Sequence, residues 1–156
     1  MLILLVSSSG GHFKGLFQLE PFFSQHSRHW VTFRSATTEQ LLQAETVTWA
    51  FSPTNRNLPN LLRNAWLAWH VIQQRRPDLI LTTGAGVAVP FLIVGKVLGC
   101  RTVFVESITR IQTLSLSARL ALRWIDDLYV HWPQLQDRYP GSILINDRLR
   151  ELQESA

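Results

Sequence analysis

The sequence predicts a single α/β domain built on one doubly wound, mostly parallel sheet. Strand-like and helix-like segments alternate along the chain, which is typical of parallel strands joined by helical crossovers. The predicted strands are continuous apolar runs, as expected when helices cover both faces of a sheet. The 156 residues contain no repeat or low-complexity linker, so we expect one domain at 1–145 and a C-terminal tail at 146–156.

The N-terminal half supplies the first three strands. Five consecutive aliphatic residues, Leu2–Val6, predict a buried strand. The alternation then predicts a helix at Phe13–His26, a strand at His29–Phe33, a short helix at Thr38–Gln43 and a strand at Val47–Phe51. The clearest helix follows at Leu58–Arg75, with Asn57 as its expected N-cap.

The C-terminal half continues the pattern with shorter elements. Two strands, Asp78–Thr82 and Thr102–Glu106, flank a helix at Ala88–Leu98. The remaining predictions are a helix at Leu116–Ile125, a strand at Leu128–His131 and a last strand at Ile143–Ile145.

The long helix carries apolar residues on two sides. One stripe at helical spacing is expected to face the core and consists of Leu58, Leu61, Leu62, Ala65, Trp69 and Ile72. Leu67 and Val71 lie nearly opposite, with Trp66 at the edge and arginines around them. We expect this outward patch to contact an anionic membrane surface or a partner subunit through Arg63, Trp66 and Leu67. The alternative is a helix buried more completely than the stripe indicates.

The charge distribution favours anionic ligands. Residues 1–125 hold 12 basic and 5 acidic side chains, and thirteen of the fifteen basic residues in the chain are arginine. Arginine suits phosphate and carboxylate groups. Nucleic acid is not an expected partner, because no stacking platform or reader motif accompanies the high pI. The single Cys100 excludes an internal disulfide, and no ligand cluster predicts a metal site.

Membrane contact is expected to be peripheral. Leu2–Val6 lacks the basic flank of a signal peptide. The longest apolar run, Ala85–Gly95, is shorter than the roughly 18 residues that a membrane-spanning helix needs.

Ligands of doubly wound sheets bind beyond the carboxyl ends of the strands, which directs attention to four loops. Ser7–His12 and Thr83–Val87 are both glycine-rich strand-to-helix turns, which suit a phosphate-bearing ligand. Neither matches a P-loop or the G-x-G-x-x-G fingerprint, and either can be a simple tight turn. Glu106–Arg110 offers a carboxylate, two hydroxyls and a guanidinium, although a helix-capping stretch is the alternative. The fourth loop is Ser52–Asn57.

Taken together, four motifs resemble a known family of glycosyltransferase subunits. They are Ser8–His12, Pro53–Asn57, Thr83–Gly86, and Glu106-Ser107 with Arg110 and Thr113–Ser115. The same order is found in bacterial polysaccharide-biosynthesis subunits of the PssD type. It is also found in the eukaryotic membrane-anchoring subunit of the split N-acetylglucosaminyltransferase that elongates dolichol-diphosphate-GlcNAc. More distantly, the layout is similar to the N-terminal, acceptor-binding half of the peptidoglycan transferase MurG.

The resemblance implies a Rossmann-like domain equivalent to the N-terminal half of a GT-B glycosyltransferase. Such a chain would bind a lipid-diphosphate-linked sugar, while a small separate subunit would bind most of the UDP-sugar donor. The implied reaction is an inverting, metal-independent hexosyl transfer in exopolysaccharide or lipid-linked oligosaccharide biosynthesis, without a cofactor. The chain is expected to be inactive alone and to sit on the cytoplasmic face of the membrane.

The resemblance also implies roles for individual residues. His12 and Glu106 are the candidate catalytic bases. The acceptor and its diphosphate would contact Ser9, Gly10, Gly11, Asn55, Arg56, Gly84, Ala85, Gly86, Ser107 and Arg110. Gln112 departs from the pattern, because these relatives often carry Glu there. The segment from Ile145 onward also lacks the glycine-containing tail that helps hold the partner in relatives.

Two alternatives come from other classes of protein. The chain can be a scaffold that recruits a catalytic partner to membranes and supplies no catalytic group. It can also be an NADP-dependent oxidoreductase in which Arg34 and Ser35 grip the cofactor phosphate. The glycine spacing and the lack of a Tyr-x-x-x-Lys pair argue against the oxidoreductase.

Overall fold

The computed structural model describes residues 1–54 and 56–145 and confirms the predicted fold class. All the strands belong to one parallel sheet in the order β3-β2-β1-β4-β5-β6-β7. The order reverses between β1 and β4, which is where doubly wound sheets bind their ligands. The predicted tail at 146–156 lies outside the described residues.

The strands agree with the predicted runs to within a few residues. Their bounds are β1 Leu2–Val6, β2 Ser27–Thr32, β3 Val47–Trp49, β4 Leu79–Thr82, β5 Arg101–Val105, β6 Asp127–Val130 and β7 Ile143–Leu144. The central strands β1 and β4 are almost wholly buried, because helices pack on both of their faces.

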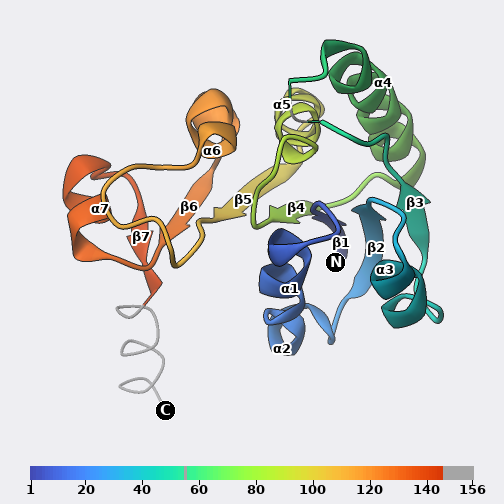
Figure 1. Cartoon of the computed structure of the whole chain (residues 1–156), viewed down its shortest axis with the longest axis horizontal. Coiled ribbons are helices and arrows are strands. Elements are labelled where there is room, and N and C mark those ends of the chain that lie inside the picture. The colour runs from blue at the N-terminus through green and yellow to red at the C-terminus, as the bar shows by residue number, and fades with distance from the viewer. Residues whose placement is uncertain (55, 146–156) are drawn as a thin grey trace.

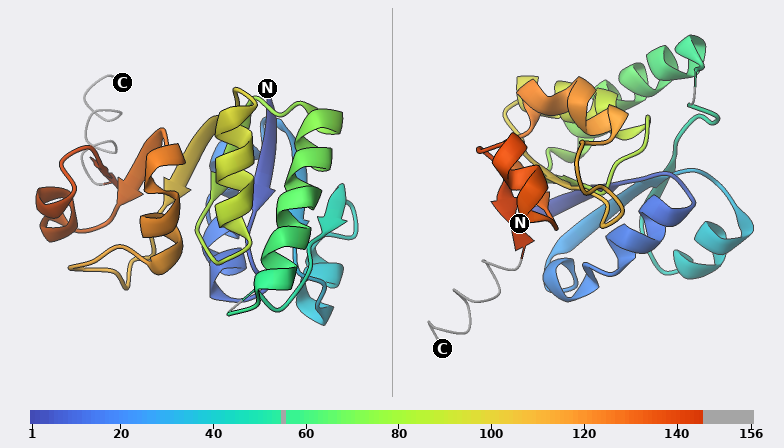
Figure 2. Two further views of the ribbon diagram at one scale, coloured as in Figure 1. Left: turned by 90° about the horizontal axis from the view of Figure 1, so that it is seen from above. Right: turned by 60° about the vertical axis from the view of Figure 1, so that its left-hand side comes forward.

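Helices cover the sheet in two layers (Figure 1). One layer holds α1 Gly11–Phe17, α2 Glu20–Phe23 and α3 Ala36–Leu41. The other holds α4 Leu58–Arg75, α5 Ala88–Val97 and α6 Leu116–Ala121, which lie side by side over the sheet (Figure 2). A separate apolar core fills the space under each layer.

Some element predictions need correction. The predicted helix Phe13–His26 is two helices, because Pro21 lacks an N–H and starts a new helix, α2. The predicted helix Leu116–Ile125 is α6 followed by a 3₁₀ turn at Leu122–Trp124. Helix α7, Pro133–Arg138, was not predicted at all, because its six residues carry too short an apolar pattern.

Helix α4 begins and ends where the sequence predicted, but it packs with the opposite face. Asn57 caps it, since its Oδ1 accepts a hydrogen bond from the Asn60 N–H at 3.0 Å. The expected core stripe is largely exposed: Leu58 and Leu62 are each 64% exposed and Trp69 is 43% exposed. Its last member, Ile72, is buried, together with Asn60, Asn64, Ala68 and Val71.

Two buried asparagines explain the reversed face of α4. Asn64 donates to the Phe51 carbonyl and accepts from the Phe51 N–H, both at 2.9 Å. Asn60 donates to the Pro53 carbonyl at 2.8 Å. These side chains satisfy the backbone of the loop between β3 and α4, so polar residues occupy the inner face. Leu67, expected to point outward, is half-buried against the core.

Candidate functional site

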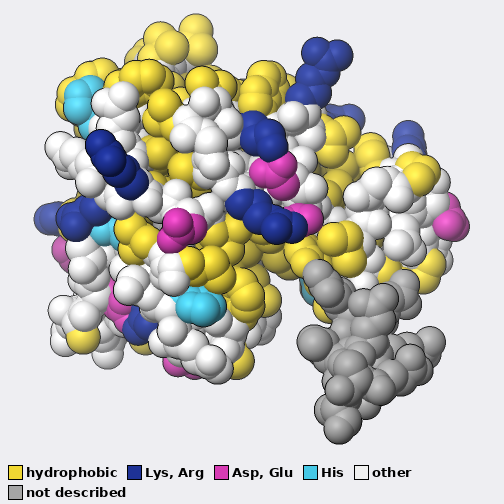
Figure 3. All heavy atoms as spheres, turned by 180° about the vertical axis from the view of Figure 1, so that it is seen from behind, with side chains coloured by type: hydrophobic (Ala, Val, Ile, Leu, Met, Phe, Trp, Pro, Cys, Tyr) yellow, Lys and Arg dark blue, Asp and Glu magenta, His cyan; other side chains and the backbone are white. Residues whose placement is uncertain are grey.

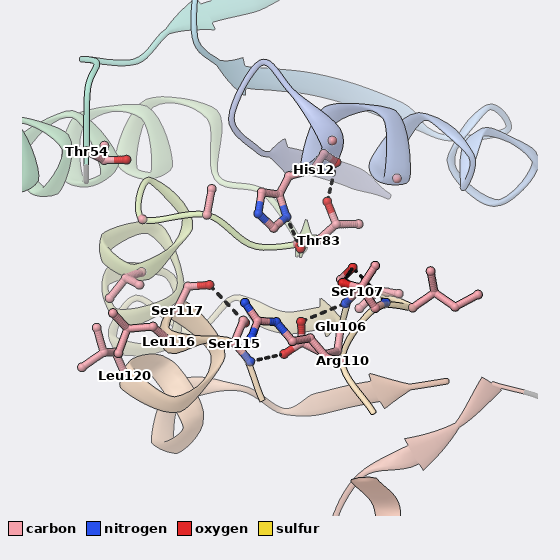
Figure 4. A pocket seen from close by; sticks show the side chains of 18 of the residues that line it. His12, Thr54, Thr83, Glu106, Ser107, Arg110, Ser115, Leu116, Ser117 and Leu120 are labelled. Atoms are coloured by element: carbon pink, nitrogen blue, oxygen red, sulfur yellow. Dashed lines mark hydrogen bonds between the residues drawn. The ribbon is translucent and has the colours of Figure 1, made fainter. Parts of the chain in front are cut away.

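A cleft of about 1280 Å³ lies at the carboxyl ends of the strands. The loops after β1, β3, β4 and β5 all contribute to its wall, as the sequence predicted. The close-up in Figure 4 shows His12 and Thr83 on one side, facing Glu106 and Arg110 on the other. The cleft therefore joins residues that are almost one hundred positions apart in the chain.

The first glycine loop leads into α1. Gly11 and His12 line the cleft, and Ser9 and Gly10 lie immediately before them in the chain without lining it. A Cβ atom added at Gly10 or Gly11 would meet no atom within 4 Å. Since packing does not require a glycine at either position, the open backbone leaves room for a ligand to approach.

His12 is hydrogen-bonded to the second glycine loop. Its Nδ1 lies 2.8 Å from the Thr83 carbonyl oxygen, and the Thr83 hydroxyl donates to the His12 carbonyl at 2.5 Å. Thr83, Ala85 and Gly86 line the cleft. Gly84 does not line it, because it sits behind the imidazole ring, and its φ of +113° is one that glycine adopts readily. Ala85 also has a positive φ, +78°.

Gly86 makes room for the third loop. A Cβ atom at this position would lie 3.0 Å from the hydroxyl oxygen of Thr54. Thr54, Arg56 and Asn57 line the cleft from the loop after β3. The predicted contact residue Asn55 lies outside the described residues.

Glu106 is buried, and both of its carboxylate oxygens accept hydrogen bonds. Its side chain is 1% exposed, and its two carboxylate oxygens accept from the Ser107 and Ser115 N–H groups, both at 2.8 Å. It therefore ties together the two ends of the 107–115 loop. Arg110 lies within this loop, exposed in the cleft, and its N–H donates to the Ser107 carbonyl at 2.9 Å.

Two ionisable cleft residues were missed by sequence reasoning. Lys14 lines the cleft one helical turn after Gly10, and only its place just after the glycine loop could have indicated it. His131 follows β6 and lines the cleft beside Glu106. Burial lowers the pKa of His131 from its ordinary value, while the neighbouring Glu106 opposes this shift. Nothing in the local sequence around His131 marks it.

The described lining is mainly basic among its charged side chains and apolar at the rim. Lys14, Arg56 and Arg110 bring positive charge, and Glu106 is the one carboxylate among the described lining residues. Leu58, Leu116 and Leu120 line the cleft and are each more than half exposed. Such a cleft is suited to a ligand with an anionic group attached to an apolar chain.

The apolar rim continues over the outer face of α4. Leu62 and Trp66 extend it, with exposed fractions of 64% and 61%, and Arg63 lies beside them. Figure 3 shows hydrophobic side chains gathered along the top of the molecule, over α4. No acidic residue lies between Glu45 and Asp78, a stretch that includes α4. None lies between Glu106 and Asp126, a stretch that includes α6. This surface is therefore apolar and basic.

Other predicted features lie elsewhere or have no counterpart in the part of the chain described. Arg34 pairs with Glu39 at 3.6 Å and lies over the Trp49 ring, away from the cleft. Among residues 1–54 and 56–145, no three His, Cys, Asp or Glu side chains come together as a metal site would need. Of the helices that are described, none has the length and hydropathy to cross a bilayer.

The fold and the cleft define an α/β domain equivalent to one half of a GT-B glycosyltransferase. Acinetobacter baumannii MurG matches with a TM-score of 0.70 at 15% identity, over 86% of this chain and 42% of MurG. Staphylococcus aureus MnaA in its complex with UDP matches with a TM-score of 0.71 at 9% identity, over 92% of this chain and 43% of MnaA. At these identities the likeness concerns the fold alone.

The sequence places the chain in a particular family. Residues 52–146 match the family described as "Oligosaccharide biosynthesis protein Alg14 like", and the chain belongs to this family. The human UDP-N-acetylglucosamine transferase subunit ALG14 is 36% identical over 90 residues, which are 54% of this chain and 42% of the human protein. The Schizosaccharomyces pombe subunit is 38% identical over 68 residues, 40% of this chain and 32% of that protein. The matches thus span less than half the length of these relatives.

Proposed function

We propose that the chain is the acceptor-binding subunit of a two-component glycosyltransferase that acts on a lipid-diphosphate-linked sugar. One observation carries the proposal: cationic side chains from helix α1 and from two separate loops line one cleft whose rim is apolar. The cations suit a diphosphate and the leucines suit a polyisoprenoid chain, so a single lipid-linked acceptor accounts for both. The printed names of the relatives, UDP-N-acetylglucosamine transferase subunits, support a transferase and a subunit role.

The donor is proposed to be a UDP-sugar held mainly by a small partner subunit across the cleft. UDP-N-acetylglucosamine is the preferred donor, because the relatives' names specify it. The chain corresponds to one half of a two-domain transferase, so we expect it to be inactive alone. Its products would be lipid-linked oligosaccharides or exopolysaccharide precursors.

In the proposed reaction His12 acts as the general base. The His12 ring takes the proton of the acceptor hydroxyl, whose oxygen then forms a bond to C1 of the donor sugar. The bond between C1 and the donor phosphate breaks as this bond forms, UDP leaves, and the configuration at C1 inverts. Lys14, Arg56 and Arg110 hold the acceptor diphosphate without a metal ion, and Ser107 and the backbone at Gly11, Ala85 and Gly86 shape the site.

Glu106, the other candidate base, has a different proposed role. Glu106 is 1% exposed and both of its oxygens accept backbone hydrogen bonds, so the carboxylate is held by the loop and offers little surface to an acceptor hydroxyl. We assign Glu106 to holding the 107–115 loop, and therefore to placing Arg110 and Ser107 in the cleft.

Peripheral contact with the cytoplasmic face of a membrane belongs to the same proposal. The exposed leucines and Trp66 of α4 can enter the interfacial layer, while Arg63 meets anionic headgroups. Because Leu58 belongs both to this surface and to the cleft rim, a lipid-linked acceptor can reach the cleft without leaving the bilayer. Trp66 and Arg63 keep their predicted contact role, and Leu67 is replaced by Leu62.

A binding experiment with the chain alone tests the acceptor assignment. By isothermal titration calorimetry we expect the chain to bind farnesyl diphosphate, and Arg110→Gln to weaken this binding about tenfold through loss of a charged hydrogen bond. Arg75→Gln, at an exposed position away from the cleft, is the matched control and should bind like the unmodified chain. Tight binding of UDP-N-acetylglucosamine with no binding of farnesyl diphosphate would instead assign the cleft to the donor.

A further inference from the structure

The second glycine loop is built around His12. The two segments exchange hydrogen bonds in both directions, from His12 Nδ1 to the Thr83 carbonyl and from the Thr83 hydroxyl to the His12 carbonyl. Figure 4 shows the imidazole and Thr83 facing each other across the strand ends. Thr83 is 7% exposed, so water competes little for either bond.

The carbonyl partner determines which ring nitrogen carries the proton. A carbonyl oxygen only accepts hydrogen bonds, so Nδ1 must be the donor at 2.8 Å. In the neutral imidazole the other nitrogen, Nε2, then holds the lone pair. The same contact therefore selects a tautomer and leaves Nε2 as the nitrogen able to accept a proton.

Gly84 supplies the space that this ring orientation needs. A Cβ atom there would lie 3.2 Å from His12 Cε1, 3.3 Å from His12 Nδ1 and 3.2 Å from Phe104 Cζ. Phe104 is fully buried and cannot retreat, so the imidazole would have to move. Gly84 was predicted to contact phosphate, but its open side is occupied by the histidine ring.

We propose that Thr83 and Gly84 are positioning residues that hold His12 in the Nδ1–H tautomer with Nε2 available as the proton acceptor. This inference rests on the proposed function for its catalytic meaning, since it assigns the tautomer that a His12 base requires. The Thr83 hydroxyl holds the backbone of His12 in place. The Thr83 carbonyl keeps the proton on Nδ1 of the His12 ring, and Gly84 leaves room for that ring.

Nitrogen-15 NMR of the imidazole rings in the full 17.9 kDa chain tests this directly at a pH where the ring is neutral. His12→Gln assigns the His12 signals among the five histidines, which include His70, whose Nδ1 also lies 2.8 Å from a carbonyl. We expect Nδ1–H to predominate at His12. Finding Nε2–H, or an even mixture, in the unmodified chain would overturn the proposal.

Variants of the two positioning residues extend the test. Thr83→Val keeps the shape but removes the hydroxyl, and should produce a mixture of His12 tautomers, whereas Thr83→Ser should restore the single tautomer. Gly84→Ala should remove the protected Nδ1–H signal, and Gly99→Ala, at a positive φ of +86° where a Cβ atom meets nothing within 4 Å, is its control. If Thr83→Val leaves the tautomer unchanged, the positioning role of the hydroxyl is wrong.

Transfer activity with the partner subunit separates this inference from the proposed function. If Thr83→Val lowers kcat at least about tenfold with little change in the KM for the donor, and Thr83→Ser restores it, the tautomer serves catalysis. If His12 has the expected tautomer but His12→Gln retains full activity, the base assignment fails while the structural inference stands.

Discussion

Several side chains that decide the properties of this domain are polar and buried. His29 is one of them: it is 2% exposed, its Nε2 lies 2.8 Å from the Thr48 hydroxyl, and its Nδ1 has no partner among the described residues. Burial, reinforced by the positive charge of Arg75, lowers the pKa of His29 from 6.5 to about 4. The folded protein therefore holds this ring neutral in a range where the unfolded chain protonates it.

Stability should consequently fall as the solution is acidified. The unfolded state binds a proton at His29 below about pH 6.5 and the folded state only near pH 4, so this contribution is complete above 6.5 and is lost between these values. Its upper bound is about 3 kcal/mol. Urea unfolding at a series of pH values measures the slope, and His29→Gln should reduce it. An unchanged slope in that variant would contradict a neutral buried His29.

Sequence reasoning indicated several residues that share the cleft, but not the hydrogen bonds that they make. His12, Arg56, Ser107 and Arg110 were predicted to share one site because each follows a strand of the same parallel sheet. The hydrogen bonds of Glu106 were not predictable from the sequence. Its second donor, the Ser115 N–H, lies nine residues later and reaches the carboxylate only because the loop folds back. A local pattern indicates a residue's position along a strand but not its hydrogen-bond partners.

Helix α4 illustrates the same limit for a whole element. Its length, its ends and its Asn57 cap followed from the sequence, because propensity and capping are local properties. Its orientation did not, because periodicity distinguishes two faces without saying which one packs inward. The asparagines that occupy the inner face do so only because the backbone at Phe51 and Pro53 lies opposite them.

Replacing Asn64 should therefore be costly although the residue is polar. Asn64→Ala removes a fully buried amide and both of its hydrogen bonds to the Phe51 backbone, and we expect the free energy of unfolding to fall by about 2–4 kcal/mol. Gln74→Ala, at an exposed position of the same helix, should change it by less than about 0.5 kcal/mol. Urea denaturation compares the two. Equal, small effects would show that the bonds to Phe51 contribute little.

The outer face of α4 makes a separate prediction about membranes. Leu62→Ala combined with Trp66→Ala should lower binding to vesicles containing phosphatidylglycerol at least about tenfold, because both side chains are exposed and would insert. Raising the salt concentration should weaken binding of the unmodified chain, since arginines contribute. The control is Val97→Ala, an exposed apolar residue on α5. In vesicle flotation, a double variant that binds as well as the control would remove α4 from the membrane contact.

At the scale of the whole molecule, the fold class followed from the alternation of elements, whereas the coverage of the sheet did not. Helices of the two layers bury both faces of β1 and β4. On β5 and β6 burial alternates: Val103, Val105 and Tyr129 are half-buried, and of these Val103 and Val105 pack against the core under the α1–α3 layer. In the sequence, the apolar runs of β5 and β6 look like those of β1 and β4, because an apolar strand does not reveal whether helices cover one or both faces of the sheet at that strand.

This arrangement places His12, Arg56, Ser107 and Arg110 in one cleft at the carboxyl edge of the sheet. In the proposed function this domain presents a lipid-linked acceptor and a second subunit delivers the donor. Dependence of sugar transfer on two chains is therefore the central prediction of the proposal.

Sugar transfer in membranes tests that consequence most directly. The chain is expressed alone and together with a candidate donor-binding subunit, and that candidate is also expressed by itself. Radiolabelled UDP-N-acetylglucosamine is supplied as donor. We predict label in the lipid fraction only when both chains are present, and its loss when His12→Ala replaces the unmodified chain. Transfer by this chain alone would contradict its assignment as an acceptor-binding half, and full transfer with His12→Ala would leave it a recruiting scaffold.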